Sequence, residues 1–282
     1  MTVFVAPTVR LGGVHGISDT GTVRRHNEDR FLIDAGLGLV AVADGMGGHQ
    51  SGAVASATAL DVVRAVLARE SAGSAPAAPE RDPDRTAIDV RWRQAHVLRQ
   101  AIDRANADLY ETNCARGHAD GQGMGTTLTG WQWLAQECAC VLFHVGDSRL
   151  YRYRDGALLQ LTRDQTAYQQ ALESGGSGAL PPQNVLLQAV GPTATVVPDI
   201  VMHDVRAGDV LLLCSDGLHG WVPHADLQAA LGEPMPLEAL CRRLVALAAQ
   251  HGSRDNITAV AARFDTLEAQ DTGGLECKPG TS

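Results

Sequence analysis

The sequence LVAVADGMGG at residues 39–48 decides how this chain is read. Its first five residues are apolar and form a run typical of a strand buried on both faces. The run ends at one carboxylate, Asp44, and three glycines follow within four residues. Asp-Gly is a common turn signal, because glycine adopts positive φ and aspartate tolerates turn conformations. A turn explains the glycines, but it gives no reason to end a buried strand with a charge.

The chain around this stretch alternates between strands and helices. Short alternating segments predict strands at 31–34, 37–43, 126–134, 138–146, 150–156, 157–162, 195–205, 209–214 and 257–264. Apolar residues at helical spacing predict helices at 51–69, 88–114, 224–231 and 237–251. The order of strands, two helices, strands, two helices and a strand predicts an α+β layered domain with antiparallel sheets in the middle.

Three segments lack a regular pattern. Residues 70–86 are rich in Pro, Ala, Ser and charge, which predicts a mobile loop. Residues 164–190 contain Gly175-Gly176 and Pro181-Pro182, and a long irregular segment of this kind in a compact domain predicts a functional flap. Residues 266–282 predict a disordered tail, so we place one catalytic domain at 12–265.

The composition limits the class of protein. The chain has 282 residues, of which 45% are apolar and 20% charged, as in a soluble globular protein. The net charge of -9 and the 4% aromatic content argue against a nucleic-acid-binding protein. No secretory signal and no apolar run of about 18 residues is evident, so we expect a cytoplasmic protein with reduced thiols that does not engage a membrane. Cys138 and Cys140 are expected in the core, on one face of a strand.

Carboxylates recur where apolar strands begin or end, beside glycine or asparagine. They are Asp44, Asp147, Asp216 and Asp255, with Glu28 and Asp29 before an earlier strand. Each one alone fits a turn. Together they are costly near a core unless they are paired or bind metal, and the nearby sequence supplies few cations, chiefly Arg24, Arg25, Arg149 and Arg254. The cluster therefore predicts divalent cations.

The ligand types narrow the choice of metal. Carboxylate oxygens without a set of histidines and cysteines suit Mg²⁺ or Mn²⁺ better than Zn²⁺. If one carboxylate bridges two such ions, a water between them becomes a nucleophile near neutral pH, an arrangement typical of phosphoester hydrolysis. On this hypothesis, the bare glycines let the carbonyl of Gly45 face a metal and leave space for a phosphate.

Six motifs occur in one order: RRHNED, VADGMGG, GMGTTLT, HVGDSRLY, LCSDGL and SRDNITAV. Together they resemble the metal-dependent type 2C family of protein Ser/Thr phosphatases in its compact bacterial form, from about Gly12 to Phe264. The resemblance implies a four-layer α-β-β-α sandwich with two central antiparallel sheets. It also implies two Mn²⁺ or Mg²⁺ ions and, in bacterial members, a more labile third ion.

The resemblance assigns roles by position. Asp44 is implied as the carboxylate that bridges two ions, with the main-chain oxygen of Gly45 on the second. The remaining implied ligands are Asp216 and Asp255 on the first ion, Glu28 and Asp29 on the second ion directly or through its waters, and Asp147 on the third. Arg24 stands where the family places its phosphate-binding arginine, and a planar guanidinium suits phosphate better than a lysine does.

The motifs depart from better-known members at Met46, where those proteins have a histidine proposed to protonate the leaving alkoxide. Met46 is expected to pack instead. Metal-bound water is one candidate for the acid, while His26 and His49 lie near the motifs but are expected on surface loops. His144, inside a strand, is expected in the core with its polar atoms satisfied.

The resemblance implies a protein serine/threonine phosphatase that acts, as a monomer, on phosphorylated proteins, with a Ser/Thr kinase and its substrates as partners. Two alternatives remain at this point. One is a metal-dependent phosphoesterase for small-molecule phosphates, and the other is an inactive homologue used for binding or sensing. The second is disfavoured because every metal-ligand motif is intact.

Overall fold

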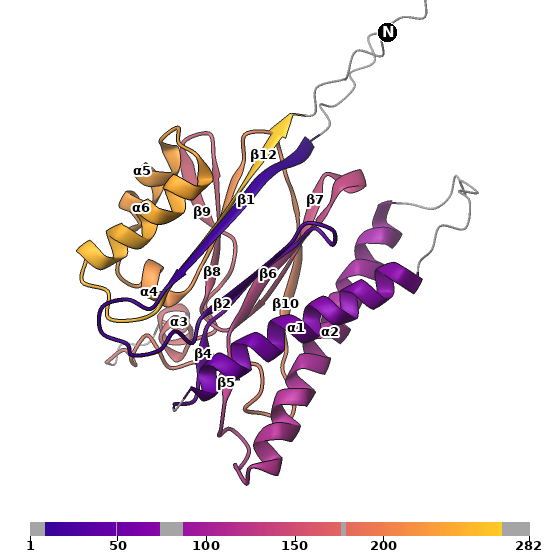
Figure 1. Cartoon of the computed structure of the whole chain (residues 1–282), viewed down its shortest axis with the longest axis vertical. Coiled ribbons are helices and arrows are strands. Elements are labelled where there is room, and N and C mark those ends of the chain that lie inside the picture. Colours follow the sequence, from indigo (N-terminus) through magenta and orange to yellow (C-terminus); the bar gives the residue numbers. More distant parts are fainter. Residues whose placement is uncertain (1–8, 49, 74–86, 176–178, 267–282) are drawn as a thin grey trace, which may run out of the picture.

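Two five-stranded antiparallel sheets form the centre of the structure (Figure 1). The computed structural model describes residues 9–48, 50–73, 87–175 and 179–266. The first sheet consists, in spatial order, of β1 (Val9–Asp19), β12 (Ile257–Thr266), β11 (Val210–Cys214), β8 (Arg149–Arg154) and β9 (Ala157–Gln160). The second consists of β10 (Asp199–Asp204), β7 (Ala139–Val145), β6 (Leu128–Leu134), β3 (Leu39–Ala43) and β2 (Arg30–Asp34). A small third sheet pairs β4 (Gly45–Met46) with β5 (Gly125–Thr126).

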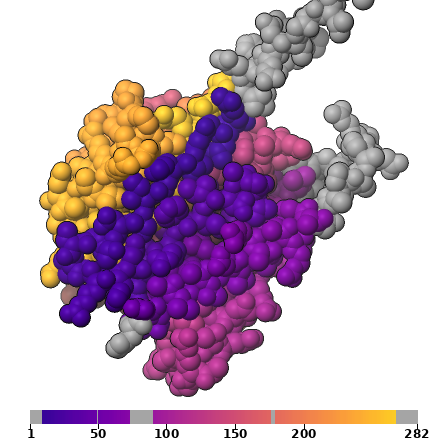
Figure 2. Space-filling view, in the orientation of Figure 1, coloured from indigo at the N-terminus to yellow at the C-terminus, as the bar shows by residue number. Residues whose placement is uncertain are grey.

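Pairs of helices cover the outer faces of the two large sheets. The second sheet packs against α1 (Ser51–Gly73) and α2 (Ala87–Ala115), and the first against α5 (His224–Gly232) and α6 (Leu237–Gln250). Shorter elements are the 3-10 turn η1 (Ala135–Glu137), α3 (Ala167–Glu173) and α4 (Asp216–His219). Figure 2 shows the N-terminal residues, in indigo, lying across one face beside the orange and yellow C-terminal helices. The predicted α-β-β-α sandwich is confirmed.

The strand sequences explain why both faces of each sheet are buried. In β3, Leu39, Ala41 and Ala43 face the α1–α2 layer, whereas Val40 and Val42 face the other sheet. In β11, Leu211 and Leu213 face the same inter-sheet core, while their neighbours face α5 and α6. Successive side chains of a strand point to opposite faces, so a strand covered on both sides is apolar at every position. This is the origin of the continuous apolar runs that precede the carboxylates.

Helix α1 is built for close packing. Ala55, Ala59, Val63 and Leu67 recur at four-residue spacing and are buried in the core beneath the second sheet. By length and composition alone, residues 51–72 could also cross a membrane. The buried stripe against the sheet and α2 identifies α1 instead as a core helix in this fold.

Several element boundaries differ from prediction. The strand predicted at 195–205 begins only at Asp199, because Pro198 has no N–H to donate to the ladder. The strand predicted from Leu37 begins at Leu39, since Gly38 adopts a φ of +61° in the turn after β2. Helix α1 continues to Gly73, into the predicted loop. The rest of that loop, residues 74–86, lies outside the described residues, as do His49, residues 176–178 of the flap and residues 267–282 of the tail.

The elements that were not predicted are β1, α3 and α4, together with the very short β4 and η1. Strand β1 pairs along its length with β12, and α4 begins at Asp216. Helix α3 lies within the predicted irregular flap, where the Thr166 hydroxyl accepts a hydrogen bond from the Gln169 amide and caps the helix. The prediction that Cys138 and Cys140 share a strand face was wrong for Cys138. It lies in the turn before β7 with a φ of +44°, whereas Cys140 is buried in the strand.

Candidate active site

The predicted carboxylates lie at one end of the sandwich. Strands β3 and β7 both pair antiparallel with β6, so they run in the same direction and bring Asp44 and Asp147 to the same edge. In the other sheet, Cys214 pairs with Ala259, which places Asp216 after β11 next to Asp255 before β12. The strand ends of both sheets therefore supply the acidic residues, as the sequence predicted.

A cavity of about 250 Å³ opens between these strand ends. Its walls contain seven of the eight predicted site residues: Arg24, Glu28, Asp44, Gly45, Asp147, Asp216 and Asp255. Further lining residues are Met46, Gly47, Gly48, Thr127, Asn184, Leu186 and Asn256. Asn184 and Leu186 belong to the predicted flap, which therefore borders the site.

The eighth residue, Asp29, lies buried behind the cavity. Its Oδ2 accepts hydrogen bonds of 2.7 Å from the hydroxyls of Ser215 and Thr258, while its Oδ1 is buried and has no partner among the described residues. In addition to burial, the charges of Asp29 and Asp216 both act on Asp44 and raise its pKa. Asp29 is thus held by residues at the end of β11 and the start of β12, and its charge acts on Asp44.

The glycine after Asp44 is a packing requirement. A Cβ on Gly45 would lie 2.1 Å from the carbonyl oxygen of Gly52 and 2.7 Å from that of Glu28, so a side chain cannot fit between the N-terminus of α1 and the β2 loop. The main chain of Asp44 is fixed as well: its N–H donates to the Thr127 hydroxyl at 2.9 Å, and its carbonyl accepts from the Thr127 amide at 2.9 Å. Met46 packs its methyl group over Gly125.

Crowding disturbs the acidity of these groups. Burial, followed by the neighbouring carboxylates, raises the pKa of Asp44 well above its usual range. Burial and Asp255 raise the pKa of Asp216 to about 6, and burial and Asp216 raise that of Asp147 to about 7. Each shift means that ionising the group costs free energy while no cation is close. A divalent cation reverses this balance, because it favours the ionised carboxylates.

The donor set fits a hard divalent metal. The carboxylates offer oxygen alone, and within the part of the chain that the structure describes the buried Oδ1 atoms of Asp29 and Asp216 have no partner. Within the described ranges, no three His, Cys, Asp or Glu side chains already form a metal cage. Mg²⁺-type sites usually retain several waters, so a few carboxylates suffice for them, whereas structural zinc sites need four protein ligands.

Arg24 stands at the mouth of the cavity with about half of its side chain exposed (52%). Its Nη2 lies 2.6 Å from Oδ2 of Asp255, and this hydrogen bond raises the pKa of the guanidinium. The other predicted cations form no ion pair with the cavity carboxylates among the described residues. Arg25 and Arg254 are exposed, and Arg149 pairs with Asp164.

Asn256 is a site residue that the sequence analysis missed. Its Oδ1 accepts from the Glu28 amide at 2.9 Å, and its Nδ2 donates to the carbonyls of Thr20 and His26 at 3.0 Å. It therefore joins the loop that carries Arg24 and Glu28 to the start of β12. The signal was present in the pair Asp255-Asn256, since a buried asparagine beside a strand needs partners for its amide.

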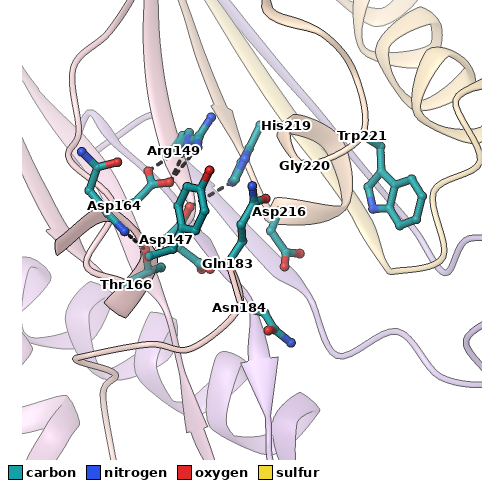
Figure 3. A pocket seen from close by; sticks show the side chains of 12 residues that line it. Asp147, Arg149, Asp164, Thr166, Gln183, Asn184, Asp216, His219, Gly220 and Trp221 are labelled. Atoms are coloured by element: carbon teal, nitrogen blue, oxygen red, sulfur yellow. Dashed lines mark hydrogen bonds and ion pairs between the residues drawn. The ribbon is translucent and has the colours of Figure 1, made fainter. Parts of the chain in front are cut away.

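A second cavity of about 500 Å³ adjoins the first and shares Asp147, Asn184 and Asp216 with it (Figure 3). One wall is the ion pair between Arg149 and Asp164, with Nη2 to Oδ2 at 2.6 Å and Nε to Oδ1 at 2.9 Å. Beside it, His219 faces Asp147, and its Nε2 lies 2.9 Å from the Asp147 carbonyl oxygen. Trp221 stands apart from these residues in the view of Figure 3.

His26 and His144 match expectation, whereas His49 lies outside the described residues. His144 is buried, with Nδ1 2.8 Å from the Thr129 hydroxyl and Nε2 3.0 Å from the Arg163 carbonyl, so its polar atoms are satisfied. Burial lowers its pKa. His26 is exposed and does not line either cavity.

A family model described as protein phosphatase 2C matches residues 22–260. The chain belongs to the protein phosphatase 2C family. It is 36% identical over 249 residues to the serine/threonine protein phosphatase PstP of Mycobacterium tuberculosis, an alignment that covers 87% of this chain and 43% of PstP. It is 32% identical over 260 residues to the serine/threonine phosphatase stp of Listeria monocytogenes, with 89% and 95% coverage.

Solved structures of protein phosphatase 2C members have the same fold. The catalytic domain of PstP in complex with two manganese ions superimposes with a TM-score of 0.72 and 31% identity, covering 91% of this chain and 98% of that domain. The resemblance drawn from the six motifs is therefore confirmed, and with it the sandwich fold. The chain spans less than half of the length of full-length PstP.

Proposed function

We propose that this chain is a metal-dependent protein phosphatase that hydrolyses phosphoserine and phosphothreonine in proteins. The observation that carries the proposal is the convergence of Asp44, Asp216 and Asp255 on one cavity, with Arg24 at its mouth. The relatives that match most of this chain bear the name serine/threonine phosphatase, which supports this substrate class.

The site residues divide the work between metal and phosphate. Asp44, the Gly45 carbonyl, Asp216 and Asp255 would hold two Mn²⁺ or Mg²⁺ ions, with Glu28 and Asp29 acting on the second ion directly or through water. Bound, these ions supply the acidity that makes water a nucleophile at neutral pH. Arg24 binds the phosphate, and its hydrogen bond to Asp255 orients the guanidinium toward the cavity.

The physiological setting follows from the substrate class. Phosphoproteins must be supplied by a kinase, so a Ser/Thr kinase and its substrates are the partners we propose. We further propose that the chain acts as a monomer in the cytoplasm, with residues 12–265 as the catalytic domain.

The decisive experiment compares two substrates and two metal conditions. Purified protein should release phosphate from a phosphoserine peptide, lose this activity in EDTA and regain it with Mn²⁺. Zn²⁺ alone should not restore it, because the donors are oxygens. A rate on the peptide far below that on p-nitrophenyl phosphate at equal concentration would favour a small-molecule phosphoesterase. No activity on either substrate with Mn²⁺ would point to a binding or sensing role.

A third, weaker ion at Asp147 is the second part of the proposal. Asp147 lines both cavities, and Met46 supplies no proton for the leaving group. A serine alkoxide leaves poorly without a proton, whereas p-nitrophenolate needs none. Asp147→Ala should therefore slow hydrolysis of a phosphoserine peptide about a hundredfold more than that of p-nitrophenyl phosphate. Equal losses on both substrates, in a variant with unchanged Tm, would remove Asp147 from this role.

A further inference from the structure

The turn that carries Asp147 is anchored at several points. On its N-terminal side, the Gly146 N–H donates to the side-chain oxygen of Gln165, and the Gly146 carbonyl accepts from the Gln165 amide at 2.8 Å. On its C-terminal side, the Ser148 hydroxyl lies 2.7 Å from that of Thr127. These contacts fix the neighbours of Asp147. None of them holds the peptide group that follows Asp147, to which its carbonyl oxygen belongs.

His219 contacts that peptide group directly. Its Nε2 lies 2.9 Å from the Asp147 carbonyl oxygen, so the ring nitrogen is the donor (Figure 3). His219 is the last residue of α4, and Asp216 is the first. The bond therefore connects two carboxylate-bearing segments from different sheets through one imidazole.

The hydrogen bond from His219 lies between two carboxylates that repel each other. The carboxylates of Asp147 and Asp216 line the same two cavities, and like charges that share a site repel each other. Repulsion would push the Asp147 turn away from α4. The bond from His219 opposes that displacement, and it remains when an ion is absent or exchanges.

Only one of the two ring nitrogens of His219 has a hydrogen-bond partner among the described residues. Its Nδ1 is buried and has no protein partner among the described residues. A buried polar atom without a partner costs free energy, so an apolar side chain would serve better here if packing were the only role of residue 219. The cost is offset where the other nitrogen holds a carbonyl in place.

We propose that His219 is a positioning residue for the third-ion carboxylate: it ties the peptide of Asp147 to the helix that begins with Asp216. This inference rests on the proposed third-ion role of Asp147. Groups that orient a metal ligand from behind typically change metal affinity 10- to 100-fold when they are removed.

A pair of matched substitutions tests the bond. Glutamine places an N–H donor near the position of Nε2, whereas methionine has a similar length and no donor. The control is His224→Met. Nε2 of His224, at the start of α5, lies 3.1 Å from the Leu158 carbonyl in β9, a bond of the same type that involves no residue of either cavity. Calorimetric titration of each metal-free variant with Mn²⁺ measures the number of sites and their affinities.

We expect His219→Met to weaken the weakest Mn²⁺ site at least about tenfold and to leave the tighter sites unchanged. His219→Gln should restore most of that affinity, and His224→Met should bind as the wild type does. Asp147→Ala should lose the weakest site. Should His219→Met fail to fold, His219→Leu provides a second donor-free side chain for the same titration.

Three results would overturn the inference. If Asp147→Ala loses the weakest site but His219→Met keeps it, His219 does not position Asp147, and the proposed third ion stands. If the tighter sites weaken instead, His219 acts through Asp216. If Asp147→Ala binds Mn²⁺ as the wild type does, the third-ion proposal itself is wrong.

Discussion

Two groups of buried carboxylates in this molecule differ in what neutralises them. Asp209 is fully buried, and Arg154 binds it with two nitrogens, Nε at 2.6 Å and Nη2 at 2.5 Å. Asp164 is held in the same two-point manner by Arg149. At the candidate active site, Asp29, Asp44 and Asp216 cluster, and no arginine among the described residues binds any of them in this way.

The pKa values show the consequence of that difference. The hydrogen bonds and charge of Arg149 outweigh burial and lower the pKa of Asp164, whereas burial among other carboxylates raises the pKa of Asp147 and Asp216. An arginine partner makes a carboxylate part of the fold. A cluster without one is costly in the folded state and is balanced by a metal. Substitutions in the two groups should therefore have opposite consequences.

The largest effect on stability is expected at Asp209. Asp209→Ala leaves Arg154 partly buried without its partner, which costs about 3–5 kcal/mol. For a chain of this size, that lowers Tm by roughly 6–20 °C. Thermal unfolding in EDTA measures the loss, and Mn²⁺ titration of the folded variant should show unchanged sites. A loss of Mn²⁺ affinity without a fall in Tm would place Asp209 with the metal cluster.

The next effect is on turnover, at Asp44. Asp44→Asn removes a charge from the metal site, so kcat should fall at least about a hundredfold, as it should in Asp216→Asn and Asp255→Asn. The same change relieves repulsion, so the metal-free variant should unfold at an equal or higher Tm than the wild type. Full activity in any of the three variants contradicts the two-metal site, and a large fall in Tm would make Asp44 resemble Asp209.

The sequence alone could not separate these two groups of carboxylates. Asp164 and Asp147 both lie near strand ends, and Arg149 is two residues from Asp147 but binds Asp164, fifteen residues further on. The choice depends on how β8 and the flap pack, which the motifs do not encode. The residues proposed as metal ligands could be predicted to lie near one another, because each belongs to a distinctive motif.

Other features that the sequence did not predict also depend on contacts between distant segments of the chain. Strand β1 contains Gly12, Gly13 and Gly16, which hide its alternation, and it is stabilised by pairing with β12 at the opposite end of the chain. Gly16 is needed there, since a Cβ would lie 2.7 Å from the ring of Phe31. Asn256 and His219 act through main-chain atoms of distant segments. Local patterns carry no information about such contacts.

A smaller effect is expected at Arg24, which shares features of both groups because it pairs with a site carboxylate while half exposed. Arg24→Ala should raise KM about ten- to a hundredfold with a smaller change in kcat, because a charge-assisted contact to phosphate is worth about 1.5–3 kcal/mol. Steady-state kinetics on a phosphopeptide measures both constants. If kcat collapses while KM holds, Arg24 acts on the transition state or on the metals. Arg25→Ala, an exposed neighbour, is the matched control.

The effect that is smallest per pH unit concerns the pH dependence of the metal-free protein. In the folded state Asp147 has a pKa of about 7, compared with 3.8 as its usual value. Between pH 3.8 and about 7, Asp147 has lost its proton in the unfolded chain but keeps it in the folded protein. Its contribution to the free energy of unfolding is therefore complete below pH 3.8 and is lost as the pH rises through 7. The loss amounts to at most about 1.4 kcal/mol for each pH unit. Buried histidines such as His144 and His219, whose pKa is lowered, act in the opposite direction below about pH 6.5, so the effect must be read as a difference between variants.

Asp147→Asn removes this one titration and leaves the histidines in place. In EDTA, the Tm of the variant relative to that of the wild type should therefore rise between pH 5 and pH 7 and level off above pH 8. Asp164→Asn is the contrasting variant: Arg149 lowers the pKa of Asp164, so its contribution is complete above the usual carboxyl range and the Tm difference should be constant from pH 5 to 8. Saturating Mn²⁺ should abolish the pH-dependent difference for Asp147, because an ion holds the carboxylate ionised at every pH in this range. If the Tm difference for Asp147→Asn does not change with pH in EDTA, the carboxylate is already ionised at pH 5. Asp147 would then not belong with the carboxylates that need a metal ion, in contrast to those neutralised by an arginine.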